Sequence, residues 1–237
     1  MNSFDIQHYR REGWAPSERV FGAEECDNFI EYMLGLQDGK ILLEGFEKRG
    51  SEEWQRTHNQ HHYDLKAKNW LIAPPLHSLL SQCLNDEPEG IQTMYFWKGS
   101  EQRRHQDQFY LPGCLSAWIA LMDVDENNGT IWVQSKSHKG RLLTTADFDE
   151  GGEFFEWDYN AAVDELFRRN DLPEIPVRAR KGDVVFFDGK LIHRGGPAAN
   201  KEYFRHVMAN HYIGQGFKDW PHIGWPRLSF DGSERFM

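Results

Sequence analysis

Hydrophobic residues in the first part of the chain recur with the period of a helix. In Ala23–Leu36 the apolar residues fall every three or four positions, which places them on one stripe of a helix that must pack against something. Gly39, shortly after, is a suitable place for this helix to stop. A second helix is predicted over Ala73–Leu84, because Pro74 and Pro75 suit its first turn and its leucines point inward.

From residue 91 onward the pattern changes to short apolar runs that are rich in β-branched and aromatic residues. Turn-forming residues separate these runs, as in Asp125–Gly129, and this combination is typical of strands. The predicted strands are residues 91–97, 116–124, 129–134, 183–188 and 203–213. A helical N-terminal part therefore leads into a β-rich core.

A long polar and aromatic insertion lies between Leu142 and Leu172, and its tail, Ala161–Arg169, suits a short helix. Insertions of this kind on a β scaffold are common places for lids and specificity loops. No repeat, low-complexity tract or Ser/Gly linker divides the chain, so we expect a single domain over residues 1–237. Its expected parts are N-terminal helices over about 1–90, a β core over about 91–214 and a C-terminal extension over 215–237.

Composition then narrows the classes of function. The 237 residues include 27 Lys and Arg against 37 Asp and Glu, a formal net charge of −10, which argues against a basic nucleic-acid-binding surface. Hydrophobic residues make up 39% of the chain, which excludes a disordered chain. No run approaches the ~18 apolar residues of a membrane span, and charges stand where a secretory signal would be apolar. We therefore expect a cytoplasmic protein that binds neither membrane nor nucleic acid.

One constellation points to metal chemistry. His105 and Asp107 are two positions apart, so an extended backbone directs both side chains to the same side, and His193 follows much later at the end of another strand. Two imidazole nitrogens and one carboxylate oxygen form the facial triad that holds non-heme Fe(II). By itself an H-x-D tripeptide is weak evidence, because the chain has 11 histidines and 37 acidic residues. The three cysteines are widely spaced and suggest neither a disulfide framework nor a zinc site.

The surroundings of His193 strengthen the interpretation of these residues as a metal site. It follows an apolar strand and precedes two glycines, which let other groups approach closely. On the next strand Arg205 shares a face with Val207, Ala209 and His211. An arginine that points into an apolar barrel needs an anionic partner, and a bound dicarboxylate would supply one.

Three segments of the chain resemble a known family. They are HQDQFYLP, AWIALMDVDENNGTIWVQSKSHKG and KGDVVFFDGKLIHRGGPAANKEYFR. In these motifs the chain is similar to the phytanoyl-CoA dioxygenase family of Fe(II)/2-oxoglutarate oxygenases, and the resemblance extends from about residue 4 to residue 214. It implies a mainly β fold, a double-stranded β-helix (jelly-roll or cupin-like) with flanking α-helices.

The resemblance also implies roles for individual residues. His105, Asp107 and His193 are expected to bind Fe(II), and Arg205 to form the salt bridge to the 5-carboxylate of 2-oxoglutarate, with Arg194 as an alternative partner. The residues expected next to the cosubstrate are Met94, Gln106, Trp118 and Gly195, of which Gly195 stands where a hydroxyl residue often contributes.

The implied activity is a dioxygenase reaction. With O2 as the second cosubstrate, 2-oxoglutarate would yield succinate and CO2, and an unactivated C–H bond of a small-molecule metabolite would be hydroxylated. Asp107 disfavours halogenation, because halogenating relatives have a small residue at the carboxylate position. Two alternatives stay open: the same chemistry ending in desaturation, cyclisation or C–heteroatom cleavage, and a non-catalytic β-barrel that only binds a ligand. We expect a monomer or a homodimer.

Some further residues allow two interpretations. His58, His61 and His62 could suggest a second metal site, but a polar loop near the pocket mouth fits them better. Arg103 and Arg104 could meet an anionic substrate, although such residues more often form structural ion pairs. Three residues could line the cavity or simply belong to the core: Tyr110, Trp132 and His211.

Overall fold

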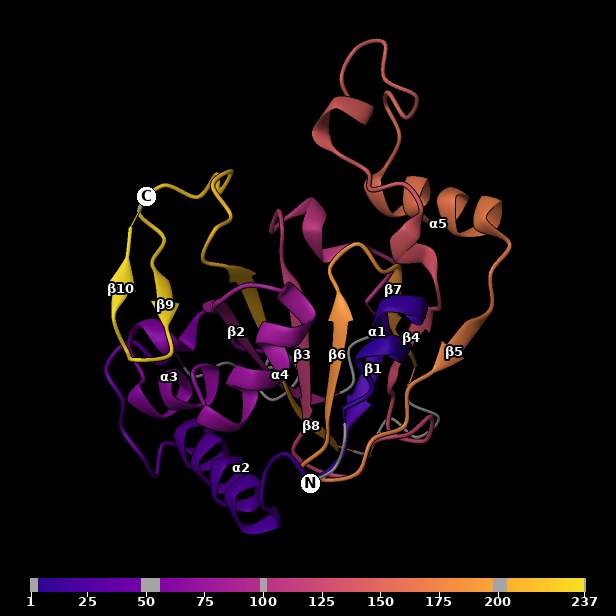
Figure 1. The fold of residues 1–237 in the computed structure, drawn as a ribbon. Coiled ribbons are helices and arrows are strands. Elements are labelled where there is room, and N and C mark those ends of the chain that lie inside the picture. The colour runs from indigo at the N-terminus through magenta and orange to yellow at the C-terminus, as the bar shows by residue number, and fades with distance from the viewer. Residues whose placement is uncertain (1–3, 48–55, 99–101, 198–203, 237) are drawn as a thin grey trace.

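Two antiparallel sheets form the centre of the computed structural model, which describes residues 4–47, 56–98, 102–197 and 204–236 (Figure 1). The larger sheet has the strand order β1-β6-β3-β8-β2-β9-β10, and the smaller one the order β5-β4-β7. The strands are β1 Trp14–Ser17, β2 Pro88–Lys98, β3 Leu115–Ala120, β4 Ile131–Gln134, β5 Glu174–Pro176, β6 Val184–Asp188, β7 His193–Gly195, β8 Phe204–Gly214, β9 Arg227–Ser229 and β10 Glu234–Arg235. The helices are α1 Ile6–Glu12, α2 Ala23–Asp38, α3 Leu65–Leu71, α4 Pro74–Leu84 and α5 Tyr159–Asn170.

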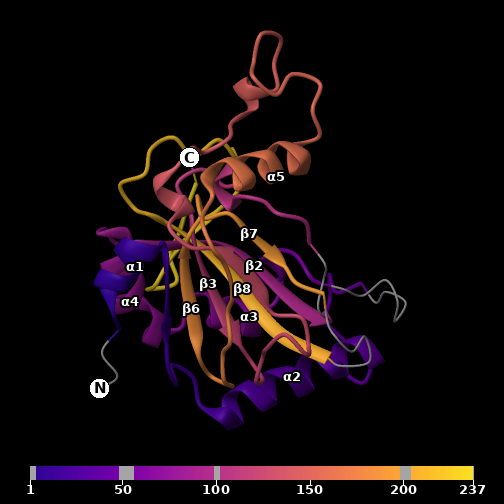
Figure 2. The same cartoon turned by 90° about the vertical axis from the view of Figure 1, so that its right-hand side faces the viewer.

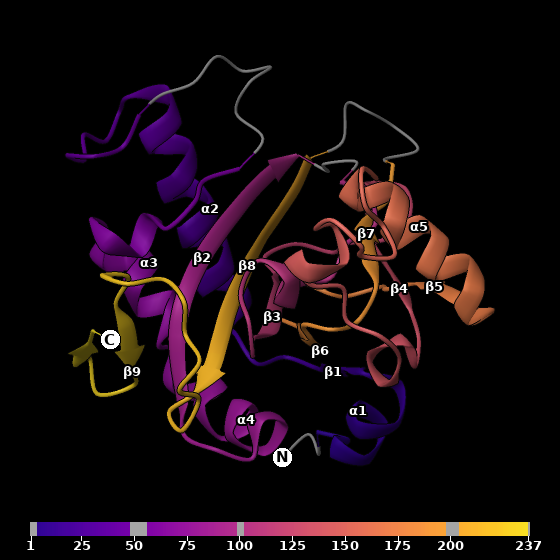
Figure 3. The ribbon, with the colours of Figure 1, turned by 90° about the horizontal axis from the view of Figure 1, so that it is seen from above.

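The helices of the first part of the chain cover the outer face of the larger sheet (Figures 2 and 3). Strand β3 shows how the two faces differ, because successive side chains point to opposite sides of a strand. Ala117 and Ile119 pack in the core between this sheet and the helices, whereas Trp118 and Ala120 pack in the core between the two sheets. Both faces of the larger sheet are therefore buried, and its inner face lines the interior of the barrel.

The mainly β fold predicted for the chain, a double-stranded β-helix with flanking helices in a single domain, is confirmed. The helix predicted over Ala23–Leu36 is α2, which ends at Gly39 in the left-handed conformation with φ 74°. The helix predicted over Ala73–Leu84 is α4, with prolines in its first turn. The tail of the insertion forms α5, and the preceding loop projects away from the sheets (Figure 1).

The strand predicted over residues 116–124 is shorter in the structure. The run 116–124 leaves the sheet after Ala120, because the chain turns at residues 121–122 and Val124 pairs with Ala179 in an isolated bridge instead. In the C-terminal extension, β9 pairs with β2 at the edge of the larger sheet. There the buried guanidinium of Arg227 lies 2.5 Å from a carboxylate oxygen of Glu89, which attaches the extension to the sheet.

None of the helices in the described part of the chain is both long and apolar enough to cross a membrane.

Candidate metal centre

Three side chains from two segments that are far apart in the sequence converge on one point. His105 and His193 pair through both backbone hydrogen bonds of an isolated antiparallel bridge, and Asp107 opens a short 3-10 helix, η2 Asp107–Phe109. Gln106 is extended, with φ −122° and ψ 122°, so His105 and Asp107 point the same way, as the sequence predicts. One donor atom from each residue lies within 4.8 Å of the others, and all three residues are buried.

A backbone carbonyl on the side away from the centre holds the ring of each histidine in its orientation. His105 Nδ1 lies 2.8 Å from the carbonyl oxygen of Arg103, and His193 Nδ1 lies 3.0 Å from that of Leu191. A carbonyl only accepts, so each Nδ1 carries a hydrogen, and each Nε2 is the ring nitrogen that faces the centre. Burial, together with the neighbouring His193, lowers the pKa of His105 to about 3, so its ring is neutral at physiological pH.

The two carboxylate oxygens of Asp107 have different neighbours. Oδ2 accepts a hydrogen bond of 2.6 Å from the Ser116 hydroxyl and lies 3.3 Å from Nε2 of His211. Oδ1 lies 3.5 Å from His105 Nε2 and 3.6 Å from His193 Nε2. Burial raises the pKa of this carboxyl, but its electrostatic interaction with His193 and the hydrogen bond from His211 outweigh burial and hold that pKa well below its usual range.

These donors fit a divalent transition metal. Two imidazole nitrogens and a carboxylate oxygen face one point, each oriented by a hydrogen bond from its other side, as is usual for metal ligands. The side-chain nitrogen of Gln102 lies 3.1 Å from His105 Nε2, and a metal ion would take over this contact.

A cavity opens directly on this centre. It is lined by Met94, Phe96, Gln102, His105, Asp107, Trp118, Ile131, Phe187, His193, Gly195, Arg205, Ala209 and His211. Met94, Trp118 and Gly195, which the resemblance implies as neighbours of the cosubstrate, are in this set. His211 lines the cavity as well, whereas Tyr110 is 52% exposed and Trp132 lies under the guanidinium of Arg194.

Gln106, which the resemblance implies next to the cosubstrate, is not among the residues that line this cavity. Its amide nitrogen donates to the carbonyl oxygens of Arg141 and Lys190, and its amide oxygen accepts from the backbone N–H of Leu143. Because Gln106 follows His105 on an extended segment, its side chain points away from the cavity. It connects three backbone segments behind the centre.

Arg205 is a buried cation in the cavity wall. It is 2% exposed, its Nη1 donates to the carbonyl of Gly129, and its guanidinium lies over the Phe96 ring. Burial lowers the pKa of Arg205 to about 10, so it stays protonated at neutral pH. Within the described ranges no carboxylate pairs with it, and its Nε lacks a partner. Arg194, by contrast, is paired with Glu174, so Arg205 is the cation available to an anion in the cavity.

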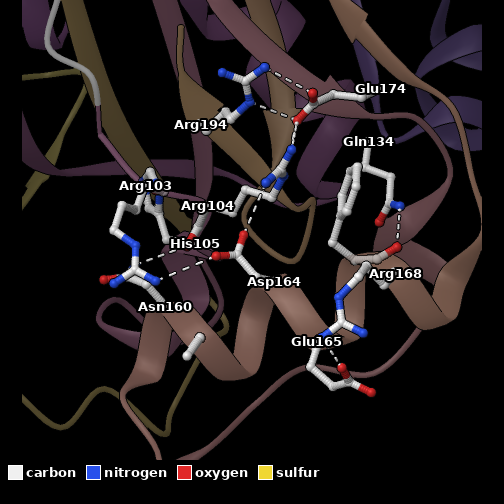
Figure 4. Close-up of polar contacts among 12 residues, drawn as sticks. Arg103, Arg104, His105, Gln134, Asn160, Asp164, Glu165, Arg168, Glu174 and Arg194 are labelled. Carbon is white, nitrogen blue, oxygen red and sulfur yellow. Dashed lines mark hydrogen bonds and ion pairs between the residues drawn. The ribbon is translucent and has the colours of Figure 1, made fainter.

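The remaining candidates have structural contacts. Arg103 and Arg104 form ion pairs with residues of the insertion, as expected for such residues (Figure 4). His61 Nδ1 lies 3.1 Å from Thr93 Oγ1, and His62 packs edge-on against it. The sequence analysis did not identify Ser116 as the partner of Asp107. The one indication of this role is its position opposite His211 in the pairing of β3 with β8.

The fold and the site together are those of non-heme iron oxygenases that use 2-oxoglutarate. A sequence profile for phytanoyl-CoA dioxygenase (PhyH) matches residues 9–207. The chain belongs to the phytanoyl-CoA dioxygenase family.

Curated relatives agree with this assignment. Phytanoyl-CoA dioxygenase 1 of Oryza sativa subsp. japonica is 30% identical over 177 residues, which cover 71% of this chain and 60% of that protein. Phytanoyl-CoA dioxygenase domain-containing protein 1 of Danio rerio is 26% identical, with 93% of each chain covered. The chain thus spans less than two thirds of the rice relative and nearly all of the zebrafish one.

Solved structures share the fold. EctD from S. alaskensis with 2-oxoglutarate and 5-hydroxyectoine superposes with a TM-score of 0.70 at 18% identity, covering 88% of this chain and 74% of that one. The epimerase SnoN from nogalamycin biosynthesis, in complex with Fe3+, alpha ketoglutarate and nogalamycin RO, has a TM-score of 0.66 at 18% identity, with 88% and 82% covered.

Proposed function

We propose that this protein is an Fe(II)- and 2-oxoglutarate-dependent dioxygenase that hydroxylates an unactivated C–H bond of a small-molecule metabolite. In this proposal His105, Asp107 and His193 hold the iron, and Arg205 binds the 5-carboxylate of 2-oxoglutarate. The β-helix core, about residues 91–214, carries the reaction within one domain. The observation that carries the proposal is one cavity that joins three converging metal donors to a buried arginine without an ion pair in the described residues.

The residues of the cavity have distinct tasks in this proposal. Bound iron would couple the oxidative decarboxylation of 2-oxoglutarate, to succinate and CO2, to oxidation of the substrate. Arg205 fixes one end of the cosubstrate, because a carboxylate partner strongly stabilises a buried guanidinium. The apolar rings of Phe96 and Phe187 help to exclude water, which protects reactive intermediates from side reactions.

Two features bear on the outcome of the reaction. Asp107 occupies the carboxylate position with both oxygens in use, which supports oxygenation over halogenation. The structural neighbours include an epimerase and a carbocyclase, so a desaturation, cyclisation or C–heteroatom cleavage is the second candidate. Product mass distinguishes them: hydroxylation adds one oxygen atom, whereas the alternatives leave the oxygen count unchanged or lower it.

An anaerobic titration tests the cofactors directly. Fe(II) and 2-oxoglutarate are added to the metal-free protein, and the visible charge-transfer band of a chelating 2-oxoacid on iron is recorded. The proposal requires a band in the wild type that weakens in Arg205→Ala. If folded wild type gives no band, a non-catalytic binding barrel becomes the better description.

The wider setting is also part of the proposal. We expect a small-molecule substrate, a cytoplasmic location and a monomer or homodimer. Size-exclusion chromatography with light scattering tests the oligomeric state, and succinate release across a metabolite panel tests the substrate class.

A further inference from the structure

Each histidine of the metal centre has an arginine beside it in the sequence. Arg104 precedes His105 and Arg194 follows His193, and both arginines point away from the metal centre. Side chains alternate along extended backbone, so Arg104 and Arg194 lie on the outer side of the bridge that joins His105 to His193. Both guanidiniums reach the same carboxylate, that of Glu174 at the start of β5 (Figure 4).

Glu174 is well suited to hold both arginines at once. Arg194 donates to both of its oxygens, each at 2.9 Å, and Arg104 donates from Nε to Oε1 at 3.1 Å. The side chain of Glu174 is 16% exposed, so its charge is screened less than that of a surface ion pair. A planar two-pronged contact of this kind fixes direction as well as distance.

The arginines are themselves held in place by neighbouring rings. The guanidinium of Arg194 lies 5.1 Å from the ring centre of Trp132, and that of Arg104 lies 3.9 Å from the ring centre of Phe167. Neither arginine is therefore free to follow a displaced carboxylate without losing a further contact.

Helix α5 holds the same stretch of backbone from a second side. Asn160 donates to the carbonyl of Arg104 at 2.9 Å, and the Tyr159 hydroxyl contacts both the N–H and the carbonyl of Gln106. Asp164 accepts a further hydrogen bond from Arg104 at 3.0 Å. The residues on both sides of His105 are thus fixed, and Glu174 alone among these groups also contacts the segment of His193.

We propose that Glu174 is a positioning residue of the metal centre. It connects the neighbours of the two histidine ligands, Arg104 and Arg194, and so sets the separation and tilt of the imidazoles of His105 and His193. Backbone hydrogen bonds hold the two segments side by side, through the bridge between His105 and His193 and from the N–H of Gly195 to the carbonyl of Gln102. Glu174 adds a side-chain constraint on their outer side, which limits their rotation relative to each other. This inference rests on the proposed function, because it requires that the two imidazoles hold the metal.

The chain offers a matched control for the test. Glu153 also bridges two arginines, Arg141 and Arg169, but it lies in the projecting insertion and contacts none of the cavity residues. Glu174→Gln and Glu153→Gln make the same chemical change. In each, an amide N–H replaces one acceptor and faces a donor of arginine.

The experiment titrates Co(II) alone into the metal-free proteins and records the affinity and the visible d–d spectrum, without turnover. We expect Glu174→Gln to bind Co(II) roughly tenfold more weakly or more, with an altered spectrum, since supporting residues of metal sites typically contribute 10–100-fold. Glu153→Gln should match the wild type in both readouts.

Further measurements make each outcome decisive. If Glu174→Gln fails to fold, Glu174→Asp, which keeps the charge but shortens the reach, takes its place and should also change the spectrum. A folded Glu174 variant with wild-type Co(II) affinity and spectrum overturns the positioning role. If the wild type itself binds no Co(II) or Fe(II), the proposed function fails instead, which separates the two failures.

Discussion

Burial shifts the pKa values of side chains in the cavity, but it does not remove every charge. The pKa of His105 is lowered to about 3, so this buried imidazole offers its lone pair rather than a proton. Arg205, with a pKa lowered to about 10, is still a cation at neutral pH. The cavity therefore presents a neutral donor to a metal and a positive charge to an anion, the combination that 2-oxoglutarate chemistry needs.

Removing the carboxylate of the centre should abolish the reaction. Asp107→Ala deletes one of three donors and leaves Ser116 and His211 without their acceptor. We expect no detectable turnover and loss of Fe(II) binding, while the far-ultraviolet circular dichroism stays that of the wild type. Full activity in this variant would contradict the assignment of Asp107 as a ligand.

Removing the buried cation should act on the cosubstrate. Taking one partner from a buried ion pair typically costs about 3–5 kcal/mol, so Arg205→Ala should weaken 2-oxoglutarate binding by roughly 100-fold or more. Binding is measured by the charge-transfer titration described above. Arg178→Ala, which removes an exposed arginine paired with Glu126, is the control and should leave the affinity unchanged. Equal affinities in the two variants would rule out the role of Arg205.

At the scale of elements, very short pieces of structure carry the site. Asp107 opens a three-residue 3-10 helix and His193 opens the three-residue strand β7. Such pieces cannot hold their geometry alone, so other segments hold them. Gln106 does this for the backbone behind the centre, and Glu174 does it for the two histidine segments.

Replacing Gln106 tests whether it is structural. Gln106→Met keeps the volume but leaves three backbone groups, one buried and two half-buried, without their partner, so the free energy of unfolding should fall by about 3 kcal/mol. Urea denaturation measures this loss. In metal-loaded protein the affinity for 2-oxoglutarate should remain within about threefold, since the side chain points away from the cavity. Weak cosubstrate binding in a fully stable variant would instead support a place for Gln106 next to the cosubstrate.

Element length explains which elements could be predicted. The apolar stripe of α2 extends over several helical turns, and the prolines of α4 mark its start, so both were found close to their bounds. β7 and β9 have three residues each, which is too short for any period to be recognised. Their existence depends on partners elsewhere in the chain, β4 and β2 respectively.

For the molecule as a whole, buried histidines predict a loss of stability in mild acid. Burial lowers the pKa of His61 to about 3 and that of His206 to about 4. Below the ordinary value of about 6.5 the unfolded chain binds these protons and the folded protein does not. Stability is therefore full above about pH 6.5 and is lost as the pH falls toward the folded values. At pH 5 each of these histidines should lower the free energy of unfolding by about 2 kcal/mol.

Thermal unfolding of the protein in EDTA, from pH 8 to pH 5, measures this effect without a contribution from bound metal. The melting temperature should fall below pH 6.5, and it should fall less in His206→Gln. A melting temperature that does not change over this range would contradict the prediction.

The amino-acid sequence by itself determined the kind of fold and which residues are candidates for the site. Residue types and strand period are local properties, so His105, Asp107, His193 and Arg205 could be proposed as site residues before any contact was known.

Only the tertiary structure decided what surrounds those residues. Ser116 meets Asp107, Gln106 points away from the cavity, and Glu174 reaches both histidine segments because strands far apart in the sequence pair in one particular register. Register and packing follow from the burial and hydrogen bonding of the entire chain, and no local stretch of sequence contains that information.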